Sequence, residues 1–208
     1  MVKVYKAGLD IGSTTAKIAL LDPDNSLVFK EYRRHHASVY DTALSFFRKI
    51  QTVFGNINID LRLTGSAALG VSKCTKLPFV QEVIAANAVI QKKYTQVKTA
   101  IDIGGEDSKI IFLSKGKPPD IRMNGSCAGG TGSFIDQMAT LLDITPLELN
   151  DLAKNHRQIY PVASRCGVFA KTDVQNMLSR NICHEDIAAS VFHAVGVQCI
   201  KNRHHWKE

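Results

Sequence analysis

The chain has 208 residues, of which 45% are hydrophobic, 22% charged and 7% aromatic, and its formal net charge is +7. This composition is that of an ordinary globular protein and excludes collagen-like, low-complexity and disordered classes. The length allows one large domain or two smaller lobes. Uninterrupted apolar stretches reach only about five residues, far below the roughly 20 of a membrane-spanning helix, and no secretion signal opens the chain. We expect a cytoplasmic protein without a membrane partner.

Positive charge is densest in residues 30–36, which read KEYRRHH. This segment favours a solvated strand end over a docking site for an acidic partner. Nucleic acid binding is not expected, because the segment lacks interleaved aromatic residues in a recognisable module. The seven histidines form no metal pair with a plausible third ligand, so we assign them no role.

The first half of the chain has the pattern of a mixed α/β lobe. Three extended runs begin at residues 6, 16 and 26 and are separated by short turns, which predicts three consecutive antiparallel strands. Apolar residues at helical spacing predict a helix over residues 41–54 that ends at Gly55. A fourth strand over residues 59–65 and a helix over residues 79–93 complete this lobe.

The pattern then begins again at an offset of 92 residues. GLDIGSTTAKIALL at 8–21 aligns with AIDIGGEDSKIIFL at 100–113, and both copies continue into a turn and a third extended run. The repeat predicts a duplicated α/β architecture, with one lobe over residues 1–95 and the other over residues 96–208. Helical patterns follow near 134–143, 170–180 and 185–200, and a capping box, TPLE at 145–148, predicts the start of a further helix at Pro146.

The two repeated turns have the character of phosphate-binding loops. Each combines glycine and hydroxyl or acidic residues between two strands, so that backbone N–H donors are closely spaced and no bulky side chain shields them. An acidic residue at the end of each first strand is suited to hold Mg2+ through its water shell. Neither turn is a Walker loop or a GxGxxG dinucleotide turn.

DIGSTTAK and DIGGEDSK resemble the two phosphate motifs of the superfamily that contains acetate kinase, sugar kinases, heat-shock chaperone ATPases and actin. The resemblance implies a duplicated, actin-like (ribonuclease H-like) ATPase fold with mixed sheets and helices, which binds ATP or ADP with Mg2+. It implies catalytic roles for Asp10, Asp102 and Glu106. The nucleotide-binding residues that it implies are Gly12, Ser13, Thr14, Thr15, Lys17, Gly104, Gly105, Asp107, Ser108 and Lys109.

Two of the five cysteines stand out by their context. Cys127 lies in a glycine-rich turn and Cys166 in SRCGVFAKTDV, each at the expected start of a helix, where free N–H groups stabilise a thiolate. Two ligands per chain leave a four-thiolate site incomplete, whereas two subunits together supply the four ligands of a [4Fe–4S] cluster. Buried, inert cysteines are the alternative. Cys74, Cys183 and Cys199 are interpreted as packing residues.

MNGSCAGGTGSFIDQMA and SRCGVFAKTDVQNML resemble the two cluster-binding segments of the activators of 2-hydroxyacyl-CoA dehydratases, a family that includes the ATPase subunits of benzoyl-CoA reductase. The resemblance implies a homodimer whose subunits share one [4Fe–4S] cluster through Cys127 and Cys166. It further implies that ferredoxin or flavodoxin donates an electron, which the protein passes to an iron–sulfur dehydratase or reductase component in a step coupled to ATP hydrolysis.

The chain departs from this family's pattern at several positions. Glu106 replaces the usual glutamine of DIGGQDSK, MNGSCAGGTG replaces MNDKCAAGTG, and Lys171 replaces an acidic residue. No C-terminal segment resembling the family's adenosine-binding strand follows the last helix, so we expect a truncated ATPase. A small-molecule kinase of the same superfamily and a non-catalytic module of a larger activase are the alternative functions.

Overall fold

The structure is a computed structural model, which describes residues 3–114, 117–123 and 129–201. The chain divides into two compact units, Met1–Gln96 and Val97–Glu208. None of the described helices is long and apolar enough to cross a membrane.

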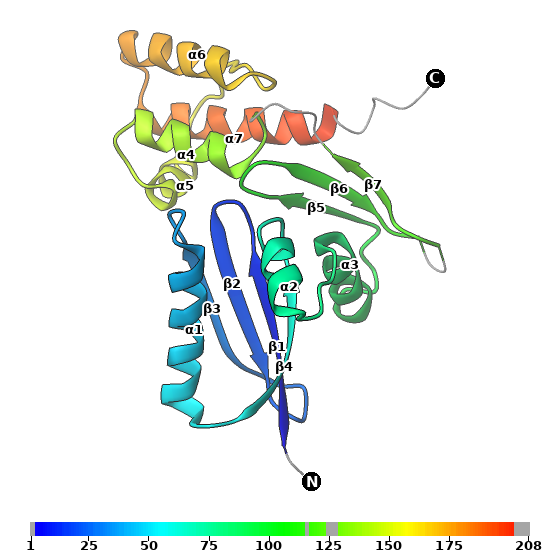
Figure 1. Cartoon of the computed structure of the whole chain (residues 1–208). Coiled ribbons are helices and arrows are strands. Elements are labelled where there is room, and N and C mark those ends of the chain that lie inside the picture. The colour runs from blue at the N-terminus through cyan, green and yellow to red at the C-terminus, as the bar shows by residue number, and fades with distance from the viewer. Residues whose placement is uncertain (1–2, 115–116, 124–128, 202–208) are drawn as a thin grey trace. The chain divides into compact units, whose positions relative to one another are not determined.

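Unit 1 is a four-stranded sheet with three helices (Figure 1). Its elements are β1 (Val4–Ile11), β2 (Thr15–Leu21), β3 (Leu27–Arg34), α1 (Val39–Phe54), β4 (Asn58–Thr64), α2 (Ala68–Thr75) and α3 (Glu82–Lys93). The strand order is β3-β2-β1-β4, in which β2 is antiparallel to β1 and β3, and β4 is parallel to β1. The three antiparallel strands, the long helix and the fourth strand expected from the sequence are confirmed, whereas α2 was not expected.

The core of unit 1 lies between the sheet and α1, which packs on β2 and β3. Alternate residues of the strands, such as Leu9 and Ile18, are buried, and Phe46 and Ile50 meet them from one face of α1. The helix ends where predicted, because Gly55 adopts a φ of 70° and donates its N–H to Gln51 O at 2.9 Å.

Unit 2 begins with a three-stranded antiparallel sheet of order β5-β6-β7 and continues as helices. Its elements are β5 (Thr99–Ile103), β6 (Ser108–Phe112), β7 (Asp120–Met123), α4 (Gly132–Leu141), α5 (Pro146–Ala153), α6 (Gly167–Ser179) and α7 (His184–Lys201). The predicted capping box is confirmed: Thr145 Oγ1 accepts the Glu148 N–H at 3.2 Å, and the Glu148 carboxylate accepts the Thr145 N–H at 2.7 Å.

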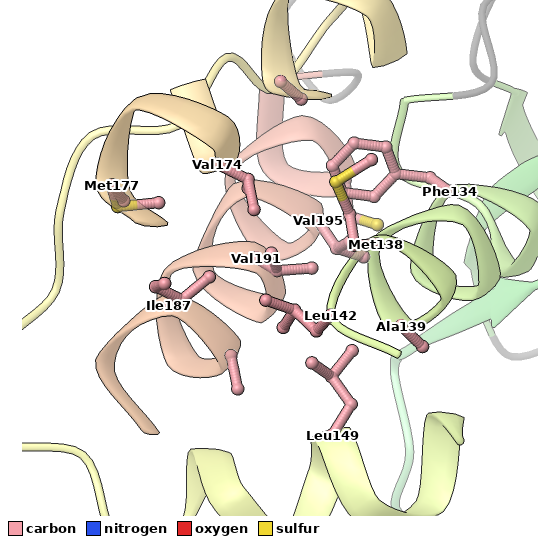
Figure 2. Close-up of a cluster of buried hydrophobic side chains, with 13 residues drawn as sticks. Phe134, Met138, Ala139, Leu142, Leu149, Val174, Met177, Ile187, Val191 and Val195 are labelled. Carbon is pink, nitrogen blue, oxygen red and sulfur yellow. The ribbon is translucent and has the colours of Figure 1, made fainter. Parts of the chain in front are cut away.

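The four helices of unit 2 enclose one apolar core, shown in Figure 2. Phe134 and Met138 enter it from α4, Val174 from α6 and Val191 from α7. Leu149 of α5 is fully buried against the same cluster. This core holds the starts of α4 and α6 in one framework.

Leu149→Ala is therefore expected to destabilise the protein by about 2–5 kcal/mol, since it leaves a cavity in a packed core. Leu147→Ala on the same helix is the control, because Leu147 is 70% exposed and its truncation should cost less than about 0.5 kcal/mol. Urea unfolding of both variants, followed by circular dichroism, measures the difference. Equal losses would contradict the packing described above.

Candidate functional site

The first repeated turn closes the β1–β2 hairpin. Ile11 pairs with Ala16, and between them the Gly12 N–H donates to Thr15 O at 2.9 Å. Ser13 and Thr14 form the tip of this turn. The amide groups of the tip lie in a short loop of small residues at the end of the sheet, the arrangement that anion-binding loops use.

The second turn closes the β5–β6 hairpin in the same way. Ile103 pairs with Ser108, and the Gly104 N–H donates to Asp107 O at 2.8 Å. Every one of these residues lies 92 positions after its counterpart in the first turn. A Cβ on Gly104 would come within 2.8 Å of Asp107 Oδ1 and 3.1 Å of Asp107 O, so a larger residue there would displace the Asp107 side chain. The sequence repeat is thus also a repeat of hydrogen-bonding pattern.

An acidic residue and a lysine face each other across each hairpin. In unit 1, Lys17 Nζ lies 2.9 Å from Asp10 Oδ2. Partial burial opposes the charge of Lys17, but the hydrogen bond and charge of Asp10 outweigh it and raise the pKa of the lysine. In unit 2, the buried Lys109 lies 3.9 Å from its partner Asp102 and 3.1 Å from Asp107.

Two residues that the sequence reasoning missed adjoin Asp10. Thr64 is its register partner on β4, and both Asp10 Oδ1 and Thr64 Oγ1 are buried without a hydrogen-bond partner among the described residues. Gly65 follows with a φ of 95°, and a Cβ there would lie 2.4 Å from Asp10 Oδ1. Buried oxygen atoms that lack partners are suited to hydrogen-bond water or to face a hydrated cation, so this corner fits the expected Mg2+.

His35 was assigned no role from the sequence and lay in a segment interpreted as solvated. That interpretation is wrong for His35, which is only 6% exposed. Its Nε2 lies 3.1 Å from Gly12 O, and its backbone N–H donates to Thr14 O at 3.2 Å. The residue therefore contacts the first repeated turn twice.

The second loop is bonded instead to the first turn of α4. The N–H groups of Gly132 and Ser133 donate to the carbonyl oxygens of Gly104 and Gly105 at 2.8 and 2.9 Å. The Ser133 hydroxyl also donates to Gly105 O at 2.5 Å. A displacement of the loop must therefore either move the start of α4 with it or strain these bonds.

Of the two cysteines singled out above, Cys166 is the N-cap residue of α6 and is half-buried, whereas Cys127 lies outside the described residues. Gly129 shows where the segment after Cys127 passes. A Cβ on Gly129 would lie 2.5 Å from Ser164 O and 2.8 Å from Arg165 O. The backbone two residues after Cys127 therefore packs against the backbone immediately before Cys166.

Three side chains fix the segment that leads to Cys166. Asp186 Oδ1 of α7 accepts the N–H groups of Arg157 and Gln158 at 2.7 and 3.0 Å, which lowers the pKa of the Asp186 carboxyl. Ser190 Oγ accepts the Tyr160 N–H at 2.8 Å, and Asp173 of α6 accepts that of Ala163 at 2.9 Å. Because the folded-state pKa of Asp186 is depressed, its contribution to stability is present above the ordinary carboxyl range and is lost as the pH falls.

The remaining predicted positions have simpler surroundings. Glu106 and Lys171 are exposed, and Lys171 lines a hollow beside α4 with Gln137. Cys199 is buried, as expected of a packing residue, and burial raises its pKa. Cys74 and Cys183 are exposed, contrary to that expectation. Among the described residues, no three acidic, histidine or cysteine side chains gather at metal-binding distance.

Comparison with known proteins matches residues 7–207 to the BadF/BadG/BcrA/BcrD ATPase family. The chain is 28% identical over 204 residues to the (R)-2-hydroxyglutaryl-CoA dehydratase activating ATPase of Acidaminococcus fermentans, a match covering 96% of this chain and 77% of that protein.

Two solved structures are similar along most of the chain. One is the activator of the 2-hydroxyisocaproyl-CoA dehydratase from Clostridium difficile with bound ADPNP, with a TM-score of 0.84 at 28% identity, covering 95% of this chain and 74% of that one. The other is component A of the Acidaminococcus fermentans (R)-2-hydroxyglutaryl-CoA dehydratase, with a TM-score of 0.84 at 26% identity, covering 99% and 80%. The expected actin-like ATPase fold is confirmed, and the chain belongs to the BadF/BadG/BcrA/BcrD ATPase family.

Proposed function

We propose that the protein is an ATP-dependent electron-transfer activator of an iron–sulfur enzyme of the 2-hydroxyacyl-CoA dehydratase kind. The observation that carries this proposal is the set of hydrogen bonds between the second phosphate loop and the first turn of α4. They join a candidate nucleotide loop to the helix that follows the Cys127 segment. The relatives named above are dehydratase activators, and one of them binds an ATP analogue.

The nucleotide is proposed to bind through the two repeated loops, one in each lobe (residues 1–95 and 96–208). Backbone N–H groups at the tips of both hairpins would bind phosphate oxygens. Asp10 and Asp102 would hold Mg2+ through its water shell, and the partnerless oxygens of Asp10 and Thr64 support this assignment in unit 1. Glu106, an exposed residue of the second loop, would orient the water that attacks the γ-phosphate. Lys17 and Lys109 would pair across the strands with these two carboxylates.

The cluster is proposed to be shared by two copies of the chain, each contributing Cys127 and Cys166. Close packing of Gly129 on residues 164–165 supports this ligand set, because it holds the backbones of the two cysteine segments together. Cys166 lies at the N-terminus of α6, where the positive end of the helix dipole suits an anionic cluster. A [4Fe–4S] cluster supplies a site that accepts and releases one electron at low potential.

Electron transfer would then depend on which nucleotide is bound. Ferredoxin or flavodoxin would donate the electron, and the dehydratase or reductase component would receive it. ATP and ADP can drive such a cycle only if they bind the two conformations of the protein unequally. The bonds from Gly132 and Ser133 to the second loop provide the route by which that difference would reach the cysteine segments.

Anaerobically purified or reconstituted protein is expected to contain about four iron and four sulfide ions per dimer and to be brown, since four thiolates hold one cluster. Cys166→Ser and Cys127→Ser should each reduce the iron content by more than half. Cys74→Ser is the matched control, because Cys74 is exposed and lies in the other unit. Iron analysis and visible absorbance test this. Absence of a chromophore after reconstitution would reject the cluster. Retention of the chromophore in a variant that carries both Cys127→Ser and Cys166→Ser would reject it as well.

ATP affinity in the presence of Mg2+ is expected to fall about tenfold or more in Asp10→Asn and Asp102→Asn, because each loses a charged contact to the hydrated ion. Asp24→Asn, in the exposed turn before β3, is the control. Titration calorimetry with a non-hydrolysable ATP analogue measures the effect. Unchanged affinity in both variants would contradict the assigned site, and phosphoryl transfer from ATP to a small-molecule acceptor would instead favour a kinase.

Ser133→Ala should weaken the coupling between nucleotide and cluster, since it removes a hydroxyl bond worth about 1 kcal/mol from the loop–α4 connection. The measurement is the rate at which an iron chelator removes the cluster, compared with ADP and with the ATP analogue. We expect the ratio of the two rates to shrink several-fold in the variant. Ser179→Ala, whose hydroxyl bonds only within α6, should leave the ratio unchanged.

A further inference from the structure

We propose that His35 is a positioning residue for the first phosphate loop, and that its imidazole fixes the direction of the Ser13 amide. This inference rests on the proposed nucleotide site, and it adds a residue that lies outside both phosphate motifs. His35 follows β3 directly and is 20 positions or more from the loop in sequence. Its ring is nevertheless buried against the loop backbone.

The contacts of the ring determine its tautomer. Nδ1 lies 3.2 Å from the Ala37 backbone nitrogen, which can only donate a hydrogen, so Nδ1 must be the acceptor. Nε2 lies 3.1 Å from the carbonyl oxygen of Gly12, which can only accept, so Nε2 must carry the hydrogen. Both contacts are satisfied only by a neutral imidazole with its hydrogen on Nε2.

The hydrogen bond from His35 Nε2 to Gly12 O sets the direction of the next N–H in the loop. In a trans peptide, the C=O and the following N–H point in opposite directions, and the described chain contains no cis peptide bond. The Gly12 carbonyl points at His35, so the Ser13 N–H points away from it. The Gly12 N–H is itself used inside the turn by Thr15 O. His35 thereby directs the first tip amide away from its own ring and leaves that N–H for a phosphate oxygen in the proposed nucleotide site.

The second repeat holds the equivalent carbonyl by different means. Gly104 O, 92 residues after Gly12 O, accepts the Gly132 N–H at 2.8 Å. The same atom of the turn is therefore anchored in both units, by a side chain in one and by a helix N-terminus in the other. Recurrence of the anchor with a different donor indicates that the turn requires it.

The backbone around His35 is bent to suit the ring. His36 and Ala37 have φ values of 45° and 64°, in the left-handed region that residues other than glycine avoid. This bend brings the Ala37 N–H to Nδ1, and the Ser38 N–H closes it on His35 O at 2.7 Å. The strained segment of His36 and Ala37 thus holds the imidazole at Nδ1, while Nε2 of the same ring contacts the loop.

Two substitutions separate the contact of Nε2 with Gly12 O from the contact of Nδ1 with the Ala37 N–H. His35→Gln keeps an amide N–H near the position of Nε2, and His35→Asn keeps an acceptor near Nδ1. If His35 positions the loop, His35→Asn should speed hydrogen exchange of the loop amides and weaken binding of the ATP analogue, each by about threefold to tenfold, the range for one lost hydrogen bond. His35→Gln should restore both measurements to within about twofold of wild type. His193→Asn, at an exposed histidine of α7 in the other unit, is the control.

The exchange measurement uses the nucleotide-free protein, so it decides the role of His35 even if the wild type binds no ATP. A wild-type protein that binds no ATP would reject the proposed function but not the role of His35. If His35→Gln is as impaired as His35→Asn, or if neither alters loop exchange, the positioning role is wrong and His35 only supports the bend. Should either variant fail to fold, nitrogen NMR of wild-type His35 decides: a neutral Nε2–H tautomer is expected, and an Nδ1–H or cationic ring would overturn the inference.

Discussion

The bond that closes each repeated hairpin is the constraint on which the candidate site depends. In both units, a glycine N–H donates to the carbonyl oxygen three residues later, and the flanking strand residues pair in the same register. Two strands joined by so short a turn leave the tip amides few directions in which to point. At Gly104 a side chain would have to displace that of Asp107, because a Cβ there would come within 2.8 Å of Asp107 Oδ1. The acid–lysine pairs then follow directly from the register.

The two units differ in which residues anchor the hairpin turn, and this difference suggests different roles for the two turns. The first loop rests on His35, which belongs to the same small unit and is itself held by a bent backbone. The second rests on the N-terminus of α4, which is continuous with the core of unit 2 and lies next to the segment that leads from Cys127. In the proposed nucleotide site, a phosphate that displaced the second loop would therefore also displace α4. A phosphate bound to the first loop would contact a turn that His35 holds in place.

Many of the strands, turns and helix ends could be predicted from the sequence, because they depend on interactions between neighbouring residues. Period-two alternation, a tight turn and the capping box at Thr145 depend on neighbouring residues, and these elements were found where expected. Helix α2 was missed, since Ala68 is its only buried residue and it has no apolar stripe to detect. His35 and Thr64 were missed for another reason: their partners lie 23 and 54 residues away, at Gly12 and Asp10. Only the sheet topology brings them together.

The departures from the family pattern can be weighed by the same contacts. Glycine stands at position 129, where the resemblance leads one to expect alanine, and a Cβ there would lie 2.5 Å from Ser164 O, which leaves no room for a methyl group. The change is therefore accommodated by tighter packing between the cysteine segments. Lys171, by contrast, is exposed and touches none of the bonds that hold Cys166. Its reversal of charge changes the surface beside α4 without touching the bonds around Cys166, so under the proposed function its consequence would lie in partner choice and association rate rather than in cluster retention.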